Sequence, residues 1–174
     1  MTQIIHDGAF HRLTIQPMMS ALENLDGILK KAEAAKMDTA ALLEARLYPD
    51  MFSLIQQLQY ALFIPVDLAR HFTDTPPPKV GYEEASFAEV HDGIGQALAY
   101  LRAVPPERMD ARAGLIVASF FDASLGLTAE DYASQVIMPD FYFHLTVAYA
   151  ILRHKGVPLG KKDFLGKLRV VRLG

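Results

Sequence analysis

Apolar residues recur along this chain at the spacing of a helix, and the first clear case lies near the N-terminus. Between residues 17 and 35 the spacing alternates between four and three positions, at Met18, Leu22, Leu25, Leu29 and Ala32. Because an α-helix has about 3.6 residues per turn, this spacing gathers the apolar side chains into one stripe. The stripe predicts an amphipathic helix that packs against others in a bundle.

A second stretch, from Leu43 to about Phe72, keeps the same rhythm but has two polar residues on its stripe. The stripe consists of Leu47, Asp50, Leu54, Gln57, Ala61, Ile64 and Leu68. Pro65 lies inside the pattern and predicts a kink or a break, because proline removes an interior helical hydrogen bond. Asp50 and Gln57 are expected to face the same apolar interior as their neighbours.

A connection and a third helix follow. Residues 73 to 81 contain three consecutive prolines, which cannot continue a helix because they lack amide donors. Apolar residues return at helical spacing from Phe87 to Leu101, so a third helix is expected there. Gly93 and Gly95 lie inside this helix, where their small size predicts close packing against a neighbouring helix.

The last third of the chain predicts a crossover and then a fourth helix. Residues 107 to 138 lack helical periodicity and contain β-prone residues, which indicates a short hairpin or an ordered crossover. The β-prone residues are Leu115, Ile116, Val117, Phe120 and Phe121. The fourth helix is expected from Pro139 to Lys155, since Gly156 suits a left-handed cap. The predicted fold class is therefore mainly all-α: a four-helix bundle in one domain, residues 1 to 174, with a long crossover before the last helix.

The composition narrows the class of protein. With 174 residues, 51% of them apolar and 21% charged, the chain is long enough for one folded domain. No uncharged apolar run approaches the ~20 residues that cross a bilayer, and the N-terminus does not resemble a secretory signal, so a cytoplasmic protein without a membrane partner is expected. A formal charge of -3 provides no overall basic field, which argues against a nucleic-acid partner. Because there is no cysteine, any metal would be bound through His, Asp or Glu.

Asp140 and His144 are the strongest candidates for chemistry, because a spacing of four places both on one face of the last helix. There they could share a metal ion or a proton. If the second helix is a neighbour, Asp50 and Gln57 face them across the bundle and complete a polar pocket. Asp140 and His144 supply only two ligands for a divalent ion; Asp50 would be a third, and Gln57 is a weak donor.

A structural role accounts for the same residues and is the favoured interpretation. Asp140 lies in the first turn of its helix, where a carboxylate caps free amides and meets the positive end of the helix dipole. His144 could be a buried neutral histidine that holds Gln57 or a tyrosine hydroxyl, because buried polar groups need partners. The residues alone leave both roles open.

Two segments of the chain resemble a known family. They are residues 139–166, PDFYFHLTVAYAILRHKGVPLGKKDFLG, and residues 45–61, ARLYPDMFSLIQQLQYA. Both are similar to a bacterial family of unknown function within the DinB-like (YfiT-like) superfamily of four-helix-bundle proteins. DinB-like proteins often hold a divalent metal on one histidine of the second helix and two histidines, four apart, of the last. By this resemblance His144 matches the second of that pair, Asp140 takes the place of the first, and Gln57 falls near the place of the helix-two histidine.

The resemblance also implies an activity and an assembly. Characterised relatives include transferases and isomerases that use low-molecular-weight thiols as cosubstrates. DinB-like proteins commonly form dimers through helix faces, so a homodimer is expected here. Since one of three histidines is present, the implied divalent-metal chemistry is altered or lost.

Two functional hypotheses follow. In the first, the bundle binds a small molecule in a polar pocket formed by Asp50, Gln57, Asp140 and His144, and its enzymatic form is an altered metal-dependent thiol transferase or isomerase. In the second, the protein is a noncatalytic dimeric interaction or stress-response module whose polar residues fix the register of the helices.

Overall fold

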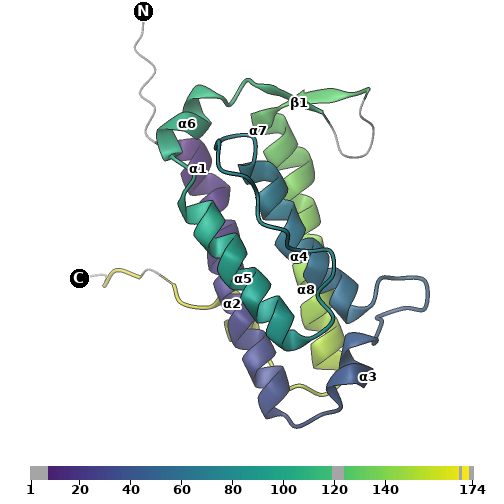
Figure 1. The fold of residues 1–174 in the computed structure, drawn as a ribbon. Coiled ribbons are helices and arrows are strands. Elements are labelled where there is room, and N and C mark those ends of the chain that lie inside the picture. Colours follow the sequence, from purple (N-terminus) through teal and green to yellow (C-terminus); the bar gives the residue numbers. More distant parts are fainter. Residues whose placement is uncertain (1–7, 119–123, 169, 173–174) are drawn as a thin grey trace, which may run out of the picture.

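Four long helices lie side by side and form the body of the molecule (Figure 1). They are α2 (Ile15–Ala34), α4 (Leu54–Ala69), α5 (Phe87–Arg102) and α8 (Met138–His154). The computed structural model describes residues 8–118, 124–168 and 170–172. Each long helix lies in one of the four stretches whose apolar spacing predicted it, which confirms the all-α bundle.

The apolar stripes of these helices meet in one core. Every long helix contributes side chains with no exposed surface, among them Met18, Leu22, Leu58, Leu62, Val90, Ala97, Phe141 and Leu152. Helix α4 is central, because it packs against α8, α5 and α2, and its contact with α8 is more extensive than any other between the described elements. Burying one leucine or phenylalanine contributes roughly 1.5–3 kcal/mol, so this helix pair is the main source of packing energy. Among the described residues, no helix is long and apolar enough to span a membrane.

Short helices complete the bundle. They are α1 (Ala9–Leu13), α3 (Thr39–Leu43), α6 (Pro106–Ala111), α7 (Ala129–Tyr132) and α9 (Lys161–Leu165). Helix α1 packs on α6, where Asp110 accepts hydrogen bonds from the backbone amides of Gly8 and Phe10 at 2.8 and 3.0 Å. A carboxylate at the first free amides of a helix stabilises its start, so α6 anchors the N-terminal helix.

The crossover contains a short antiparallel ladder, as its β-prone residues predicted. Strand β1 (Ile116–Ala118) pairs with β2 (Gly126–Thr128), and Val117 lies opposite Leu127. Phe120 and Phe121, which the sequence also assigns to this crossover, lie outside the described residues. The ladder leads directly into the last helical segment.

That last segment begins earlier than the sequence predicted. The chain is helical from Ala129, passes through a π-helical segment, η1 (Ala133–Ile137), and continues into α8. A π-helical turn holds more residues than an α-helical turn and therefore shifts the apolar stripe. A search at a fixed spacing of about 3.6 cannot follow such a shift, which explains the poor periodicity before Pro139. At the other end Gly156 has a φ of 101°, in agreement with the predicted left-handed cap.

The first part of the second predicted helix, residues 44–53, is not helical. Helix α3 ends at Leu43, and residues 44–53 form an irregular loop closed by an antiparallel bridge between Arg46 and Ser53. Helix α4 begins after Ser53, because the amide and hydroxyl of Ser53 both donate to Gln56 Oε1, at 3.0 and 3.2 Å. Asp50 therefore lies exposed in a turn, and its predicted place on a helical stripe was wrong.

Of the kink or break predicted at Pro65, the break is absent. Helix α4 runs through Pro65, which is buried, and ends at Ala69. A proline in a helix interior costs about 3 kcal/mol or more. Because α4 packs on three long neighbours, its buried apolar surface outweighs this cost.

The proline-rich connection crosses α4 as an extended segment, and we call residues 77–82 the strap. Gly81 of the strap has a φ of 84°, and a Cβ atom built on it would lie 2.5 Å from the carbonyl oxygen of Gln59. Only glycine fits there, because other residues rarely adopt this backbone conformation and their side chains would collide with α4. The strap is therefore held against the bundle.

The two glycines of α5 differ in their surroundings. A Cβ atom on Gly93 would lie 2.8 Å from Leu62 Cδ1, which agrees with the predicted close packing. A Cβ atom on Gly95 would meet nothing within 4 Å, so close packing does not explain this glycine. Gly95 simply weakens the helix, since glycine gains more freedom than alanine on unfolding.

These surroundings predict opposite effects for two matched substitutions. Gly81→Ala should lower the free energy of unfolding by about 1–3 kcal/mol, because of its backbone conformation and its contact with α4. Gly95→Ala should raise it by about 0.5–1 kcal/mol, because alanine favours the helix and meets no neighbour. Urea unfolding followed by circular dichroism measures both. A stable Gly81→Ala protein would contradict the close approach of the strap.

Candidate functional site

Gln57 and His144 meet across the contact between α4 and α8. His144 Nδ1 lies 2.6 Å from Gln57 Oε1, and the two residues are 6% and 1% exposed. Both come from apolar stripes, so the same packing that buries the leucines brings these polar groups together. A buried amide and a buried imidazole each need a partner, and here each serves the other.

The other end of the Gln57 amide determines which histidine nitrogen carries the proton. Gln57 Nε2 donates to the carbonyl oxygen of Phe52 at 3.3 Å, which turns the amide oxygen toward His144. An oxygen can only accept, so His144 Nδ1 carries a proton and donates it to Gln57. Nε2 is then the free nitrogen of the neutral ring, and it lies 3.3 Å from Asp140 Oδ1.

Burial keeps this histidine neutral over a wider pH range than an exposed one. Desolvation lowers the pKa of His144, while the nearby carboxylate of Asp140 opposes the shift and raises it. The net direction is downward, so Nε2 keeps its lone pair at neutral pH. When Nε2 does take up a proton, it can donate a hydrogen bond to Asp140, whose side chain is 26% exposed. The pair is therefore built to accept and release a proton.

Aromatic rings surround His144. Tyr60 of α4 stacks on the imidazole with ring centroids 4.7 Å apart, and Phe52 stacks on Tyr60 at 5.2 Å. Phe143 of α8 meets the imidazole edge-on at 5.4 Å. Phe52, Tyr60 and Phe143 are 39%, 37% and 53% exposed, so the buried histidine is framed by rings that solvent reaches. We call Phe52, Tyr60, Phe143 and His144 the aromatic cluster.

The structure thus brings three of the four predicted residues into one array and leaves the fourth on the surface. Gln57, His144 and Asp140 follow one another in contact, whereas Asp50 is exposed in the turn before α4. The sequence interpretation missed the rings of the aromatic cluster. Phe52 and Tyr60 could have been noticed because they flank Gln57, and Phe143 because it precedes His144.

These residues do not fit a divalent metal site. His144 Nδ1 is already bonded to Gln57, which leaves one imidazole nitrogen and one carboxylate as donors. A protein site for zinc or a similar ion uses three or four such ligands. Over residues 8–118, 124–168 and 170–172, no group of three His, Asp or Glu side chains is placed to hold a metal. The arrangement suits a proton rather than a metal ion.

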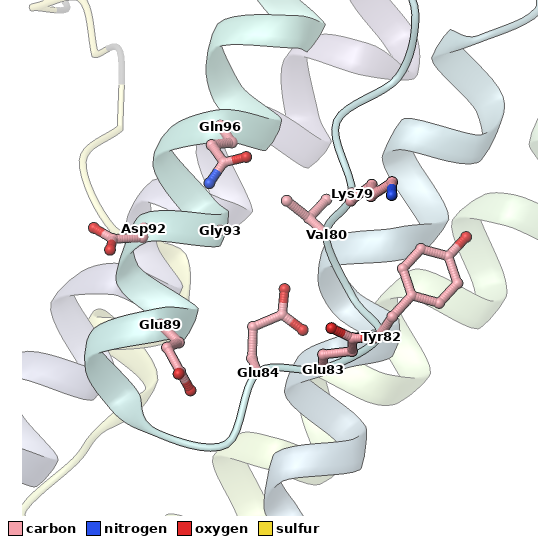
Figure 2. Close-up of a pocket in the computed structure, with 9 residues that line it drawn as sticks. All are labelled: Lys79, Val80, Tyr82, Glu83, Glu84, Glu89, Asp92, Gly93 and Gln96. Atoms are coloured by element: carbon pink, nitrogen blue, oxygen red, sulfur yellow. The ribbon is translucent and has the colours of Figure 1, made fainter.

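A separate cleft of about 750 Å³ lies between α5 and the strap (Figure 2). Figure 2 shows the Glu84 carboxylate pointing between α5 and the strap residue Val80. Two of its four carboxylates support the local backbone, because Glu84 accepts from the Gly81 amide at 2.8 Å and Glu89 from the Ala85 amide at 2.7 Å. The cleft contains none of the four predicted site residues.

Comparison with known proteins shows the family. The sequence profile described as domain of unknown function DUF1993 matches residues 10–165. The chain belongs to the DUF1993 family. No curated protein matches the chain in sequence.

A solved structure places this DUF1993 chain among DinB-like proteins. The crystal structure of a DinB family member protein from Shewanella denitrificans is 33% identical to it, with a TM-score of 0.87. The match covers 95% of this chain and 97% of that one. The resemblance that the two sequence segments indicated is therefore confirmed, together with the DinB-like bundle.

The lowered pKa of His144 predicts how stability depends on pH. A histidine whose pKa is lower in the folded protein binds more protons when unfolded, so the free energy of unfolding falls as the pH drops below about 6.5. Between about pH 7.5 and about pH 5, wild type should lose stability more steeply than His144→Gln, because glutamine takes up no proton. Urea unfolding at several pH values measures the difference.

Because His144→Gln also changes the packing at this position, a second variant that keeps His144 tests the charge effect independently. Asp140→Asn removes the charge that favours protonated His144, so its stability should fall more steeply toward acid than that of wild type. Equal slopes for all three proteins would show that His144 titrates alike in the folded and unfolded chains, contrary to its burial.

Proposed function

We propose that this DinB-like protein binds a small molecule at the aromatic cluster and uses His144 Nε2 as a base toward it. The observation that supports this proposal is the hydrogen bond from His144 to Gln57, which fixes the proton on Nδ1 and leaves Nε2 as acceptor. A ligand that fits this arrangement has a flat apolar part to lie against exposed rings and an O–H or S–H group to donate to Nε2.

The enzymatic form of the proposal is a metal-free transferase or isomerase that uses a small thiol. In that step the S–H proton moves to His144 Nε2, leaving a thiolate beside an imidazolium. Asp140, 3.3 Å from Nε2, stabilises the imidazolium, and Gln57 keeps the ring in place. A thiolate is the reactive form of a thiol, so the protein would activate a bound cosubstrate without any cysteine of its own.

Phenol and its methyl ether, anisole, test the binding step. Phenol should cause saturable shifts in the NMR signals of the Tyr60 and His144 rings, because its ring stacks and its O–H donates to Nε2. His144→Gln should weaken this binding about tenfold, as expected for loss of a hydrogen bond in a partly buried site. His154→Gln, at the exposed end of the same helix, is the matched control and should bind phenol like wild type.

Anisole separates stacking from proton donation. It has the same ring but no donor, so it should bind more weakly than phenol. Equal binding of the two, or equal phenol binding by wild type and His144→Gln, would reject a role for Nε2. Absence of any saturable shift in wild type would reject the site.

The exposed rings also support a second candidate, a noncatalytic dimeric interaction module. Phe143 and Tyr60 present apolar surface from two neighbouring helices, and a second copy of this chain would cover it. The Gln57 and His144 pair then serves to fix the register of α4 and α8. Aromatic side chains often dominate the energy of such interfaces.

Sedimentation over a range of concentrations tests this candidate. Wild type should form dimers, and Phe143→Ser should raise their dissociation constant about tenfold or more, since it removes a large ring from the interface. Leu13→Ser, which changes an exposed residue of α1, is the control and should leave the dimer intact. A wild-type monomer at every concentration would exclude the module.

A further inference from the structure

A second cluster of polar residues lies at the other end of the contact between α4 and the last helical segment. Asp67, on the last turn of α4, is only 4% exposed although it carries a carboxylate. Tyr132 donates its hydroxyl proton to Asp67 Oδ2 at 2.8 Å, and Arg70 donates from Nε to Asp67 Oδ1 at 2.7 Å. Both carboxylate oxygens are therefore engaged.

These bonds orient the guanidinium group of Arg70. Because Nε is held by a buried and immobile carboxylate, the direction of the two terminal nitrogens is set by the fold. Among the described residues these terminal nitrogens have no hydrogen-bond or ion-pair partner, and the side chain is 50% exposed. Arg70 thus has an anchored side and a free side.

After these pairings, the free side of Arg70 carries the positive charge of the cluster. Burial raises the pKa of Tyr132 well above its ordinary value, and the Asp67 charge adds to the shift, so the tyrosine stays a neutral donor. The Asp67 charge is compensated by its two donors. An incoming group meets the open edge of a guanidinium, which suits a carboxylate through two parallel hydrogen bonds.

Arg70 and its partner Asp67 line a cleft whose remaining walls are mainly apolar. The cleft has a volume of about 340 Å³ and lies between the second half of α4 and the strap. Its apolar walls include Phe63 and Val66 of α4 and the strap residues Pro77, Pro78, Val80 and Tyr82. Phe63 and Tyr82 meet edge to face with centroids 5.5 Å apart. This volume is at the small end of the range for ligand pockets.

We propose that this cleft binds a small carboxylate with an apolar, ring-sized body, with Arg70 as the residue that holds the carboxylate. The apolar body would lie between Phe63 and the strap, and Asp67 acts as a positioning residue for Arg70. A surface arginine that only caps a helix end would need no buried carboxylate, because water and backbone carbonyls satisfy it. The buried Asp67 is costly unless its partners are fixed, and of its two partners Arg70 lines the cleft.

The strap gives the site a defined wall. Gly81 allows the strap to approach α4 so closely that its neighbours Val80 and Tyr82 line the cleft. Figure 2 shows Val80 and Tyr82 from the side of the acidic cleft, where they form part of its edge. The strap therefore separates an acidic cleft from one with an open guanidinium, so an anion should enter only the latter.

Benzoate is the probe for this site, with benzyl alcohol as its neutral counterpart. In a titration of the full chain followed by backbone NMR, benzoate should shift the amide signals of Gly81, Tyr82 and Arg70 in a saturable way. Benzyl alcohol should bind at least about tenfold more weakly, because it lacks the charge that pairs with Arg70. Arg70→Gln should weaken benzoate binding by a similar factor.

Arg102→Gln is the matched control, since it removes an arginine that pairs with Glu23 on the exposed surface. It should bind benzoate like wild type. Circular dichroism establishes that both variants fold before their binding is compared. The proposal fails if benzoate causes no saturable shift at the strap, if benzyl alcohol binds equally well, or if Arg70→Gln binds benzoate like wild type.

Discussion

The packing of α4 against α8 is the contact on which the other features of this protein depend. It is the most extensive contact between described elements, and one buried polar array lies in it, while a second joins α4 to α7 at the start of the same continuous helical segment. Gln57 meets His144 near one end of α4, and Asp67 meets Tyr132 near the other. Because these pairs are far apart along α4, they allow only one register between the helices. A shift by one turn would break both pairs, and each buried polar group left unsatisfied costs about 1–3 kcal/mol.

Burial between α4 and the last helical segment gives the two arrays different chemical properties. At the His144 end, burial and a fixed amide produce a neutral imidazole whose free nitrogen faces a half-buried carboxylate. At the Asp67 end, the buried carboxylate accepts hydrogen bonds from Tyr132 and Arg70, and it holds the exposed Arg70 guanidinium in place. One end therefore provides a base and the other a positive charge. The loop before α4 and the strap after it supply the aromatic and apolar walls beside them.

Residues with a regular apolar spacing predicted their elements well, and the exceptions have identifiable causes. Helices α2, α5 and most of α8 lie where the apolar spacing predicted them. Leu47 and Asp50 matched that rhythm by chance, because the local hydrogen bonds of Ser53 and Gln56 start α4 after them. The π-helical segment hid the beginning of the last helical segment, since one extra residue shifts the stripe. The helix does not break at Pro65 because α4 packs on three neighbours, and such packing lies outside any local pattern.

The sequence by itself determined the fold class, the faces on which Gln57 and His144 lie, and the absence of cysteine side chains as nucleophiles or ligands, because periodicity and composition are local properties. It also indicated the family, through two segments that carry the polar stripe positions. Tertiary structure decided which polar groups meet, which nitrogen of His144 is free, and that Asp50 is left outside. It alone revealed the pairing of Asp67 with Tyr132, whose positions are far apart in the chain. Such pairings depend on the rotation of each helix about its axis, which is set only when all the helices pack together.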